Sequence, residues 1–202
     1  MKNNNKVKLL YLGKTNEKIF NFLKKKKISF NSFEKNVNQK KLKLISKYEY
    51  LICYGYRHIL KKKILKYFKN KAYNCHISYL PWNRGAQPNF WSFFDNTPKG
   101  ITIHAIDEGI DTGSIIFQKK ITLDKKGTLS STYKKLHKEM EKLIINKIPI
   151  ILKKNNNLKF KKQIKKGTYH GKKEIDIYLK NFKNFYSLKV SSVEKLKNDK
   201  KN

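Results

Sequence analysis

The run YLICY at residues 50–54 decides the fold. It contains no charge, and such a run is typical of a strand buried on both faces of a parallel sheet. Similar runs occur at 7–12, at 28–33 and, as YNCHI, at 73–77, and stretches with helical periodicity separate them. This alternation predicts an α/β fold with a mostly parallel, Rossmann-like sheet flanked by helices.

Further elements follow from the same patterns. We expect helices at 16–26, 37–47, 59–68 and 89–94, and strands at 100–106 and 114–119 on either side of the turn DEGIDTG at 107–113. Apolar residues at spacings of three and four predict a long amphipathic helix over 129–148, and Pro149 marks its end or a kink.

The length of 202 residues predicts one main domain over 1–154 and a short C-terminal appendage over 155–202, partly flexible. The appendage is polar apart from GTYHGKKEIDIY at 167–178, which is either a small hairpin docked on the domain or part of a flexible tail. The final EKLKNDKKN at 194–202 is expected to be disordered.

The formal net charge is +34, from 48 basic and 14 acidic residues, and only Arg57 and Arg84 among the basic residues are arginine. Nucleic-acid sites depend on arginine for bidentate contacts that lysine cannot reproduce. The chain is also rich in Asn, Ile, Phe and Tyr, which share A/T-rich codons with Lys. We therefore interpret the excess charge as genomic drift at tolerant surface positions rather than as a nucleic-acid site.

Other classes are disfavoured as well. No apolar run is long enough to span a membrane and no signal peptide is apparent, so the sequence predicts a cytoplasmic protein with no membrane partner. The two cysteines, Cys53 and Cys75, lie in separate strand-like runs without a Cys/His cluster. Neither a disulfide framework nor a metal site is expected.

One segment of the chain does not share the excess of lysine. Residues 72–118 contain one lysine and one arginine against four acidic residues, together with both tryptophans and three of the four prolines. Burial in the centre of the sheet explains the missing lysines but not the polar side chains that this segment keeps.

Asn74 and His76 stand two residues apart in a predicted strand, so their side chains leave the same face near its carboxyl end, where open α/β sheets bind ligands. Asp111 follows in a glycine-bounded turn. An amide donor, an imidazole and a carboxylate suit attack of a nucleophile on a carbonyl carbon. A hydrogen-bonded structural cluster is the alternative.

These segments, in order and spacing, resemble a known family. NCHISYLP at 74–81, Arg84-Gly85, GITIH at 100–104 and DEGIDTG at 107–113 are similar to the 10-formyltetrahydrofolate-dependent formyltransferases, and so is CYGYRHIL at 53–60. The resemblance implies the formyltransferase fold and a formyl donor, 10-formyltetrahydrofolate, with no metal. Asn74 and His76 then stabilise the oxyanion, and Asp111 relays or accepts the proton of the attacking amine.

The resemblance also implies binding residues. The folate is expected against two loops, through Tyr56, His58, Ile59, Leu60, Asp107, Gly109 and Ile110. The acceptor is expected near Trp82, Arg84, Gly85 and His104. For Trp82 and Trp91 the alternative is packing, for Arg84 it is bracing of a loop, and for His58 it is an exposed loop histidine.

Among acceptors, the resemblance favours a small amine, in particular the amino group of a nucleotide-linked amino sugar. The turn LGKTNEK at 12–18 lacks the glycine- and serine-rich phosphate loop of glycinamide ribonucleotide enzymes. Two alternatives stay open: a methionyl-tRNA formyltransferase-like enzyme without the C-terminal tRNA-binding domain, and a non-enzymatic basic binding module on this scaffold. Family members with sugar substrates are often dimers, so a homodimer is an expectation of the resemblance.

Overall fold

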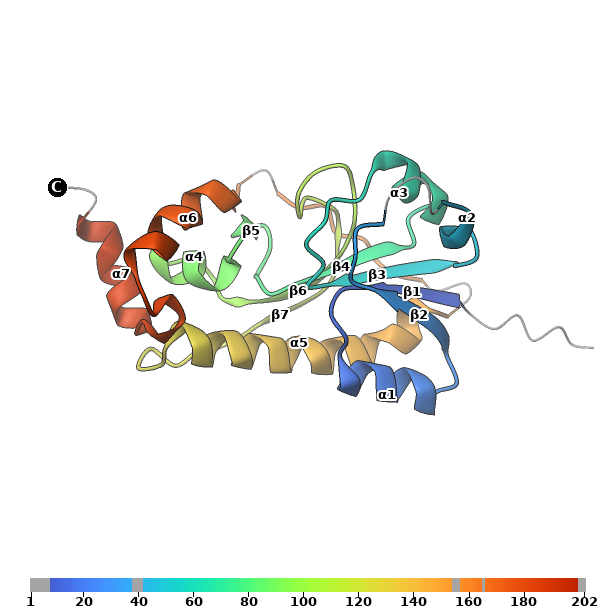
Figure 1. Cartoon of the computed structure of the whole chain (residues 1–202), viewed down its shortest axis with the longest axis horizontal. Helices are drawn as coiled ribbons and strands as arrows, with labels where there is room; N and C mark the ends of the chain where they lie inside the picture. Colours follow the sequence, from blue (N-terminus) through green and yellow to red (C-terminus); the bar gives the residue numbers. More distant parts are fainter. Residues whose placement is uncertain (1–7, 38–41, 154–156, 165, 200–202) are drawn as a thin grey trace, which may run out of the picture.

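Six strands form one sheet at the centre of the molecule, in the order β2-β1-β3-β4-β6-β7 (Figure 1). The computed structural model describes residues 8–37, 42–153, 157–164 and 166–199. The strands are β1 (Lys8–Leu12), β2 (Ser29–Phe33), β3 (Tyr50–Tyr54), β4 (Ala72–His76), β6 (Gly100–Ala105) and β7 (Ile115–Lys120). The first four are parallel, and β6 and β7 each run antiparallel to the preceding strand in the sheet. The predicted mostly parallel sheet is confirmed.

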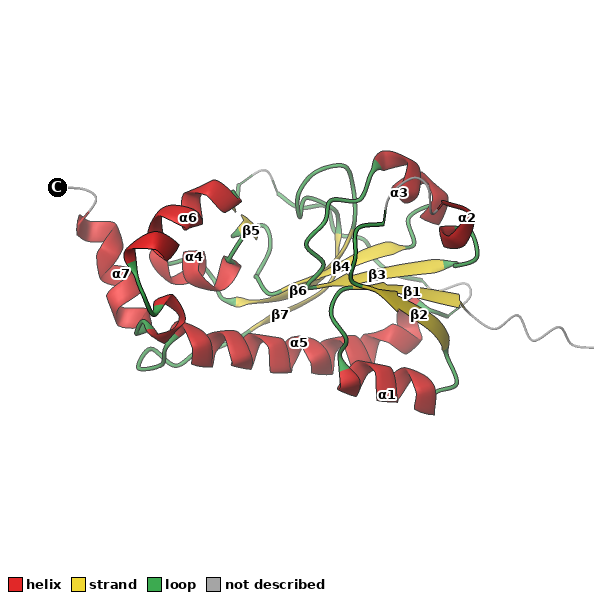
Figure 2. Cartoon of the chain, in the orientation of Figure 1, coloured by secondary structure: helices red, strands yellow, loops and turns green. Residues whose placement is uncertain are grey.

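Helices cover both faces of this sheet (Figure 2). On one face lie α1 (Glu17–Lys25) and α5 (Leu129–Ile151), and on the other lie α2 (Leu42–Ile45) and α3 (Lys62–Phe68). The remaining elements gather at one end of the molecule: β5 (Arg84–Gly85), α4 (Pro88–Phe94), β8 (Tyr169–His170), α6 (Lys172–Asn181), the 3-10 helix Phe185–Ser187 and α7 (Val190–Asp199).

Alternation along the strands explains why the central runs are apolar throughout. In β1, Leu9 and Tyr11 belong to the core beneath α1 and α5, while Leu10 and Leu12 belong to the core beneath α2 and α3. Strand β3 divides between the two cores in the same way, with all five residues buried. A strand with both faces covered gains from an apolar residue at every position, and the run at 50–54 shows this directly.

Three helices differ from the prediction in their bounds. The helix expected from residue 59 begins at Lys62, because Lys61 is extended, with a ψ of 149°, and Ile59 is 77% exposed and gains nothing from packing in a helix. The long helix does not end at Pro149 but continues to Ile151, which is buried with Ile148. Of the helix expected at 37–47, only Leu42–Ile45 is helical in the described part, and residues 38–41 lie outside it.

In its described part, the C-terminal extension forms a strand and helices in place of the small hairpin that was one of the two expectations. Strand β8 pairs in parallel with β5, and α6 and α7 follow it, so the segment 194–199 that we expected to be disordered is helical. Residues 200–202 and the expected domain boundary at 154/155 lie outside the described residues. The cause of the difference is a third apolar core, in which residues of α4, the start of α5, α6, the 3-10 helix and α7 pack together: Phe90, Trp91, Phe93, Leu129, Ile175, Tyr178, Phe185, Val190 and Val193.

His170 adds a polar contact to this packing. Its imidazole stacks on Trp91, with ring centroids 3.9 Å apart and planes 6° apart. Its Nε2 lies 2.7 Å from Oδ2 of Asp95 and its Nδ1 lies 3.0 Å from Oε2 of Glu174. Burial lowers the pKa of His170, but the hydrogen bonds to the two carboxylates outweigh it and the pKa is raised above its usual value.

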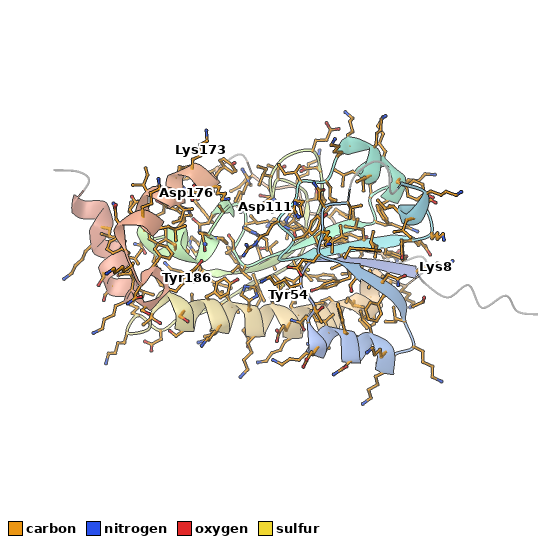
Figure 3. All side chains as sticks on the ribbon, in the orientation of Figure 1. Lys8, Tyr54, Asp111, Lys173, Asp176 and Tyr186 are labelled. Atoms are coloured by element: carbon orange, nitrogen blue, oxygen red, sulfur yellow. The ribbon has the colours of Figure 1, made fainter. Side chains whose placement is uncertain are left out.

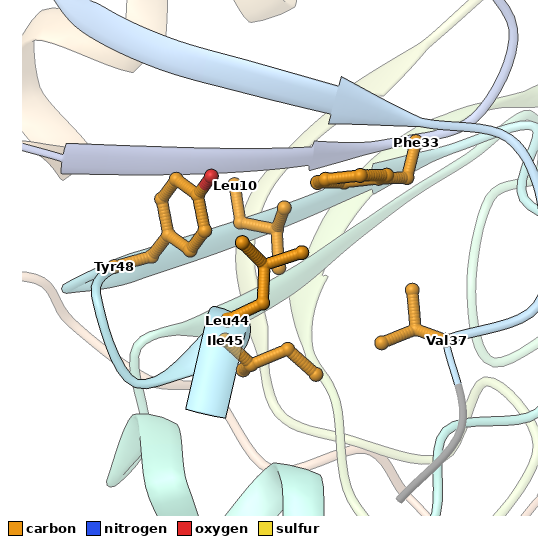
Figure 4. Close-up of a pocket in the computed structure, with 6 residues that line it drawn as sticks. All are labelled: Leu10, Phe33, Val37, Leu44, Ile45 and Tyr48. Atoms are coloured by element: carbon orange, nitrogen blue, oxygen red, sulfur yellow. The ribbon is translucent and has the colours of Figure 1, made fainter. Parts of the chain in front are cut away.

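A small pocket lies between β1, the end of β2 and α2 (Figure 4). It is lined by Leu10, Phe33, Val37, Leu44, Ile45 and Tyr48. Apart from the Tyr48 hydroxyl, which donates to Oδ1 of Asn31 at 2.6 Å, these lining side chains carry no polar atom. The pocket is therefore an extension of the apolar core and no place for catalysis.

Within the described ranges, every helix is too short or too polar to cross a lipid bilayer.

The packing of α6 is testable with a matched pair of isoleucines. Ile175 is 2% exposed and Ile177, on the same helix, is 56% exposed. Ile175→Ala is expected to lower the free energy of unfolding by about 2–5 kcal/mol, because it opens a cavity in the third core. Ile177→Ala is expected to change it by less than about 0.5 kcal/mol. Urea unfolding measures both, and equal effects would mean that the extension does not pack as described.

The His170 contacts predict a pH-dependent stability. The folded state favours the protonated imidazole, so the contribution is complete below the unfolded pKa of about 6.5 and is lost as the pH rises through the raised folded pKa. The difference in melting temperature between the wild type and His170→Gln is therefore expected to shrink from pH 6 or so toward alkaline pH. A difference that stays constant over this range would contradict the contribution of the two carboxylate contacts.

Candidate active site

Four groups converge on the carboxylate of Asp111, in the turn between β6 and β7. Figure 3 labels Asp111 near the middle of the molecule. Its Oδ1 accepts a hydrogen bond from Nδ2 of Asn74 at 3.0 Å, and its Oδ2 accepts one from the backbone N–H of Gly85 at 2.9 Å. Nε2 of His104 lies 3.4 Å from Oδ1, and Nδ1 of His76 lies 3.6 Å from Oδ2. The Asp111 side chain is only 11% exposed. The structure thus brings Asn74, His76 and Asp111 together.

Strand geometry explains how these side chains meet. Asn74 and His76 leave the same face of β4, and His104 on β6 lies directly opposite Asn74 in the antiparallel register. Nδ2 of Asn74 and Nε2 of His104 are 3.2 Å apart. The site is therefore built on rigid strands, and the turn after β6 carries Asp111 to them.

Each imidazole has one nitrogen committed to a backbone carbonyl. Nε2 of His76 lies 3.0 Å from the carbonyl oxygen of Asn83, and Nδ1 of His104 lies 2.7 Å from that of Ala105. A carbonyl oxygen only accepts, so these two nitrogens carry hydrogen, and the other nitrogen of each ring faces Asp111. Each ring that takes up a proton places it toward the carboxylate, so the cluster is able to receive and hold a proton.

The electrostatics keep Asp111 ionised. Burial alone raises the pKa of this carboxyl, but the two imidazoles and the Gly85 N–H outweigh burial and hold the pKa of Asp111 well below its usual value. The carboxylate is thus an anion throughout the neutral pH range.

The loop after β4 contributes residues that sequence reasoning missed. Asn83 is fully buried with a positive φ of 55°, and its Nδ2 donates to the hydroxyl of Thr97 at 2.7 Å while its carbonyl holds His76. Nε2 of Gln163, in the C-terminal extension, donates a hydrogen bond to the backbone carbonyl of Asp111. The only local signal is the turn-forming sequence WNRG at 82–85, and the partners of Asn83 and Gln163 lie far away in the chain.

The residues expected near an acceptor have mixed surroundings. Gly85 has a φ of 89°, and a Cβ there would lie 2.3 Å from the carbonyl oxygen of His170, so β8 can approach β5 only because residue 85 is glycine. Nε and Nη2 of Arg84 donate to Oε1 of Gln163 at 3.1 and 3.0 Å, which braces this loop. Trp82 is half-buried and its carbonyl accepts from the Ser78 hydroxyl. Trp91 is buried in the third core, where it packs rather than faces a ligand.

The residues expected at the folate lie on two neighbouring loops, at 56–60 and 107–110. Lys62, just after the first loop, forms an ion pair of 2.7 Å with Glu108 of the second loop. Ile59 is 77% exposed and Ile110 is 42% exposed, so each loop presents an apolar side chain to solvent. His58 is exposed and its ring contacts that of Tyr56.

The other residues of these loops mainly fix the backbone. The Tyr56 hydroxyl accepts from the N–H of Val37 at 2.9 Å, and Leu60 is buried in the core beneath α2 and α3. The Asp107 carboxylate accepts from the N–H of Gly109 and the hydroxyl of Thr112. Two backbone segments with exposed apolar side chains suit a flat heterocycle that forms hydrogen bonds with backbone amide groups.

Among the described residues, no cluster of three or more His, Cys, Asp or Glu side chains is arranged to hold a metal ion.

Comparison with known proteins gives the family. The family model for formyl transferases matches residues 2–148, so this α/β chain with its Asn-His-Asp site belongs to the formyl transferase family. The family resemblance and the fold expected from the sequence are confirmed.

Two relatives illustrate the range of the family. The chain is 35% identical over 149 residues to the bifunctional polymyxin resistance protein ArnA of Wigglesworthia glossinidia brevipalpis. It is 37% identical over 107 residues to the methionyl-tRNA formyltransferase of Prochlorococcus marinus (strain MIT 9515). These matches cover 70% and 52% of this chain but only 23% and 32% of the relatives, so the chain spans about a quarter to a third of their length.

Similarity to a solved structure extends further. The crystal structure of the formyltransferase PseJ from Anoxybacillus kamchatkensis, in complex with UDP-4,6-dideoxy-4-formamido-L-AltNAc and tetrahydrofolate, is 36% identical with a TM-score of 0.85. The match covers 92% of this chain and 97% of that chain.

Proposed function

We propose that the chain transfers a formyl group from 10-formyltetrahydrofolate to the amino group of a nucleotide-linked amino sugar. The observation that supports this most is the likeness to the PseJ structure, which covers almost the whole of both chains and so includes much of the C-terminal extension. That structure holds a formylated amino sugar on UDP together with tetrahydrofolate.

The bonds formed and broken in the proposed step balance, and so does the proton. The amine nitrogen forms a bond to the formyl carbon, the bond between that carbon and N10 of the folate breaks, and one proton passes from the amine to N10. Attack on the carbonyl places negative charge on its oxygen, and donors aimed at that charge accelerate the reaction. In the proposal Asn74 and His76 supply these donors: an Nδ2 hydrogen of Asn74 turns from its present partner to the oxyanion, and His76 donates through the proton that its Nδ1 takes up.

Asp111 and the imidazoles handle the proton. The carboxylate stays ionised and faces one nitrogen of both His76 and His104, so it stabilises an imidazolium as the amine proton is taken up. Because both rings are tied to backbone carbonyls, they keep the same nitrogen toward the carboxylate while the proton is held. The same tie limits reorganisation of the site during the reaction.

The donor and the acceptor are assigned to different sides of this cluster. Ile59 and Ile110, with the backbone of Tyr56 to Leu60 and Asp107 to Ile110, are proposed to hold the folate. The fit rests on the apolar side chains that these two loops expose and on the Lys62–Glu108 ion pair that joins them. Trp82 and Arg84 are proposed to face the sugar nucleotide, with Gly85 and His104 acting there through their contacts with Asp111.

Asp111→Asn tests the proposed role of the carboxylate. The variant keeps the shape but loses the anion, and it sets an amide against the N–H of Gly85 or of Asn74. We expect the transfer rate to fall by about 100- to 10,000-fold, the usual contribution of proton transfer, with folate affinity changed less than about threefold. Rapid-quench kinetics and calorimetric folate titration measure the two quantities.

The matched control is Asp124→Asn, a turn aspartate whose Oδ1 accepts from the N–H of Lys126. This control is expected to turn over like the wild type. Wild-type turnover by Asp111→Asn itself would refute the assignment of the carboxylate.

Methionyl-tRNA is the second candidate acceptor, favoured by the 37% identity to the methionyl-tRNA formyltransferase. Salt separates the two acceptors. Binding through many phosphates would make kcat/KM fall by about 10³-fold or more between about 50 and 200 mM salt. A sugar nucleotide presents few charges, so we expect only a small effect of salt.

A further inference from the structure

The side-chain amide of Gln163 lies behind the turn that carries Asp111. Its Nε2 donates to the carbonyl oxygens of Asp111 and Gly113, each at 2.8 Å. Its Oε1 accepts from Nε and Nη2 of Arg84. Both hydrogens and both lone pairs of the amide are therefore used.

The chemistry of these partners fixes the amide in one orientation. Carbonyl oxygens only accept and a guanidinium only donates, so an exchange of the amide oxygen and nitrogen would oppose like groups at every contact. Glutamate and methionine, which are close to glutamine in size, each lose the two hydrogen bonds to the turn. Only a side chain with donors and an acceptor together satisfies both sides.

The two hydrogen bonds from Nε2 of Gln163 to this turn, which we call the clamp, hold a backbone conformation that needs support. Asp111 has a φ of 54°, in the left-handed region that residues other than glycine occupy only when the surroundings hold them there. At Gly113, a Cβ would lie 1.8 Å from the carbonyl oxygen of Ala105, so the turn is pressed against the end of β6. The hydrogen bonds from Gln163 hold the backbone on both sides of Thr112 in this conformation.

Gln163 also reaches the carboxylate by a second route. Oε1 of Gln163 accepts from Arg84, and Arg84 directly precedes Gly85 in the chain. The Gly85 N–H in turn donates to Oδ2 of Asp111. The segment of Gln163 is itself anchored to the sheet, because Lys161 and Ile115 exchange backbone hydrogen bonds of 2.8 and 2.9 Å at the start of β7. The amide thus connects the main chain of Asp111 with the strand that binds its side chain.

From this geometry we propose that Gln163 is a positioning residue for formyl transfer, and that the C-terminal extension through it completes the active site. Gln163 fixes the Asp111 carboxylate against His76 and His104 without itself reaching the reacting atoms. The kinetic part rests on the proposed function, whereas the effect on the two imidazoles does not.

Gln163→Met and Gln163→Glu test the clamp. Methionine keeps the bulk without any of the hydrogen bonds, and glutamate keeps an acceptor for Arg84 but sets an anion against two carbonyls. In both variants kcat is expected to fall about 100-fold, as for a misplaced catalytic group, while KM for folate and acceptor changes less than about threefold. Gln163→Glu also shows whether the Arg84 contact alone suffices, and it serves as the second variant if one of the pair folds poorly.

Gln87→Met is the matched control. Nε2 of Gln87 donates to the Tyr186 hydroxyl at 2.9 Å, so this variant also removes a contact between the main domain and the extension, but not one at the turn of Asp111. Its kcat is expected to equal that of the wild type. A merely structural role of Gln163 would instead lower the melting temperature and leave kcat of the folded enzyme unchanged, which would overturn the proposal.

A second readout does not depend on activity. Nitrogen-15 NMR of the imidazoles is expected to show moved resonances for His76 and His104 in Gln163→Met, with the His170 resonances unmoved and no change in Gln87→Met. Unmoved His76 and His104 resonances in folded Gln163→Met would overturn the proposal. If the wild type transfers no formyl group but these resonances move, the clamp stands and the proposed function fails.

Discussion

The buried carboxylate of Asp111 is the constraint on which the rest of the structure depends. A carboxylate that is 11% exposed is costly unless hydrogen bonds and neighbouring cations compensate it, and here the compensation comes from β4, β5 and β6 together. The order of these elements, the loop from residue 77 to 83 and the left-handed turn at Asp111 therefore act as one unit. It keeps an anion beside two imidazoles that can accept a proton.

The positions of the acidic residues also indicate that specific contacts hold the charged groups of this protein. Only 14 residues are acidic, and several of them make specific contacts: Asp111 with the imidazoles, Asp95 and Glu174 with His170, and Glu108 with Lys62. One of the two arginines, Arg84, is bound to Gln163. These acidic residues and Arg84 thus stand where specific contacts use them, while most lysines in the described part of the chain are exposed. The large positive charge accordingly says little about the acceptor.

The sheet and the central cluster were predictable because their signals are local. Strands such as β3 are apolar on both faces, and the spacing of Asn74 and His76 fixes a common face. The C-terminal helices were not predicted, because many lysines hide an apolar stripe that runs through Ile175, Tyr178, Leu179 and Phe182. Contacts such as Gln163 to Asp111, 52 residues apart, leave no local pattern and emerge only from the folded chain.

The most direct measurement is a mass-spectrometric transfer assay with the full chain and 10-formyltetrahydrofolate. Its acceptor panel holds UDP- and dTDP-linked amino sugars, glycinamide ribonucleotide and initiator methionyl-tRNA. We expect an amino-sugar nucleotide to gain one formyl group and tetrahydrofolate to appear in equal amount. Formylation of the tRNA alone would contradict the proposed acceptor, and no formylation of any acceptor by enzyme that binds the folate would contradict the proposed transfer to this class of amines.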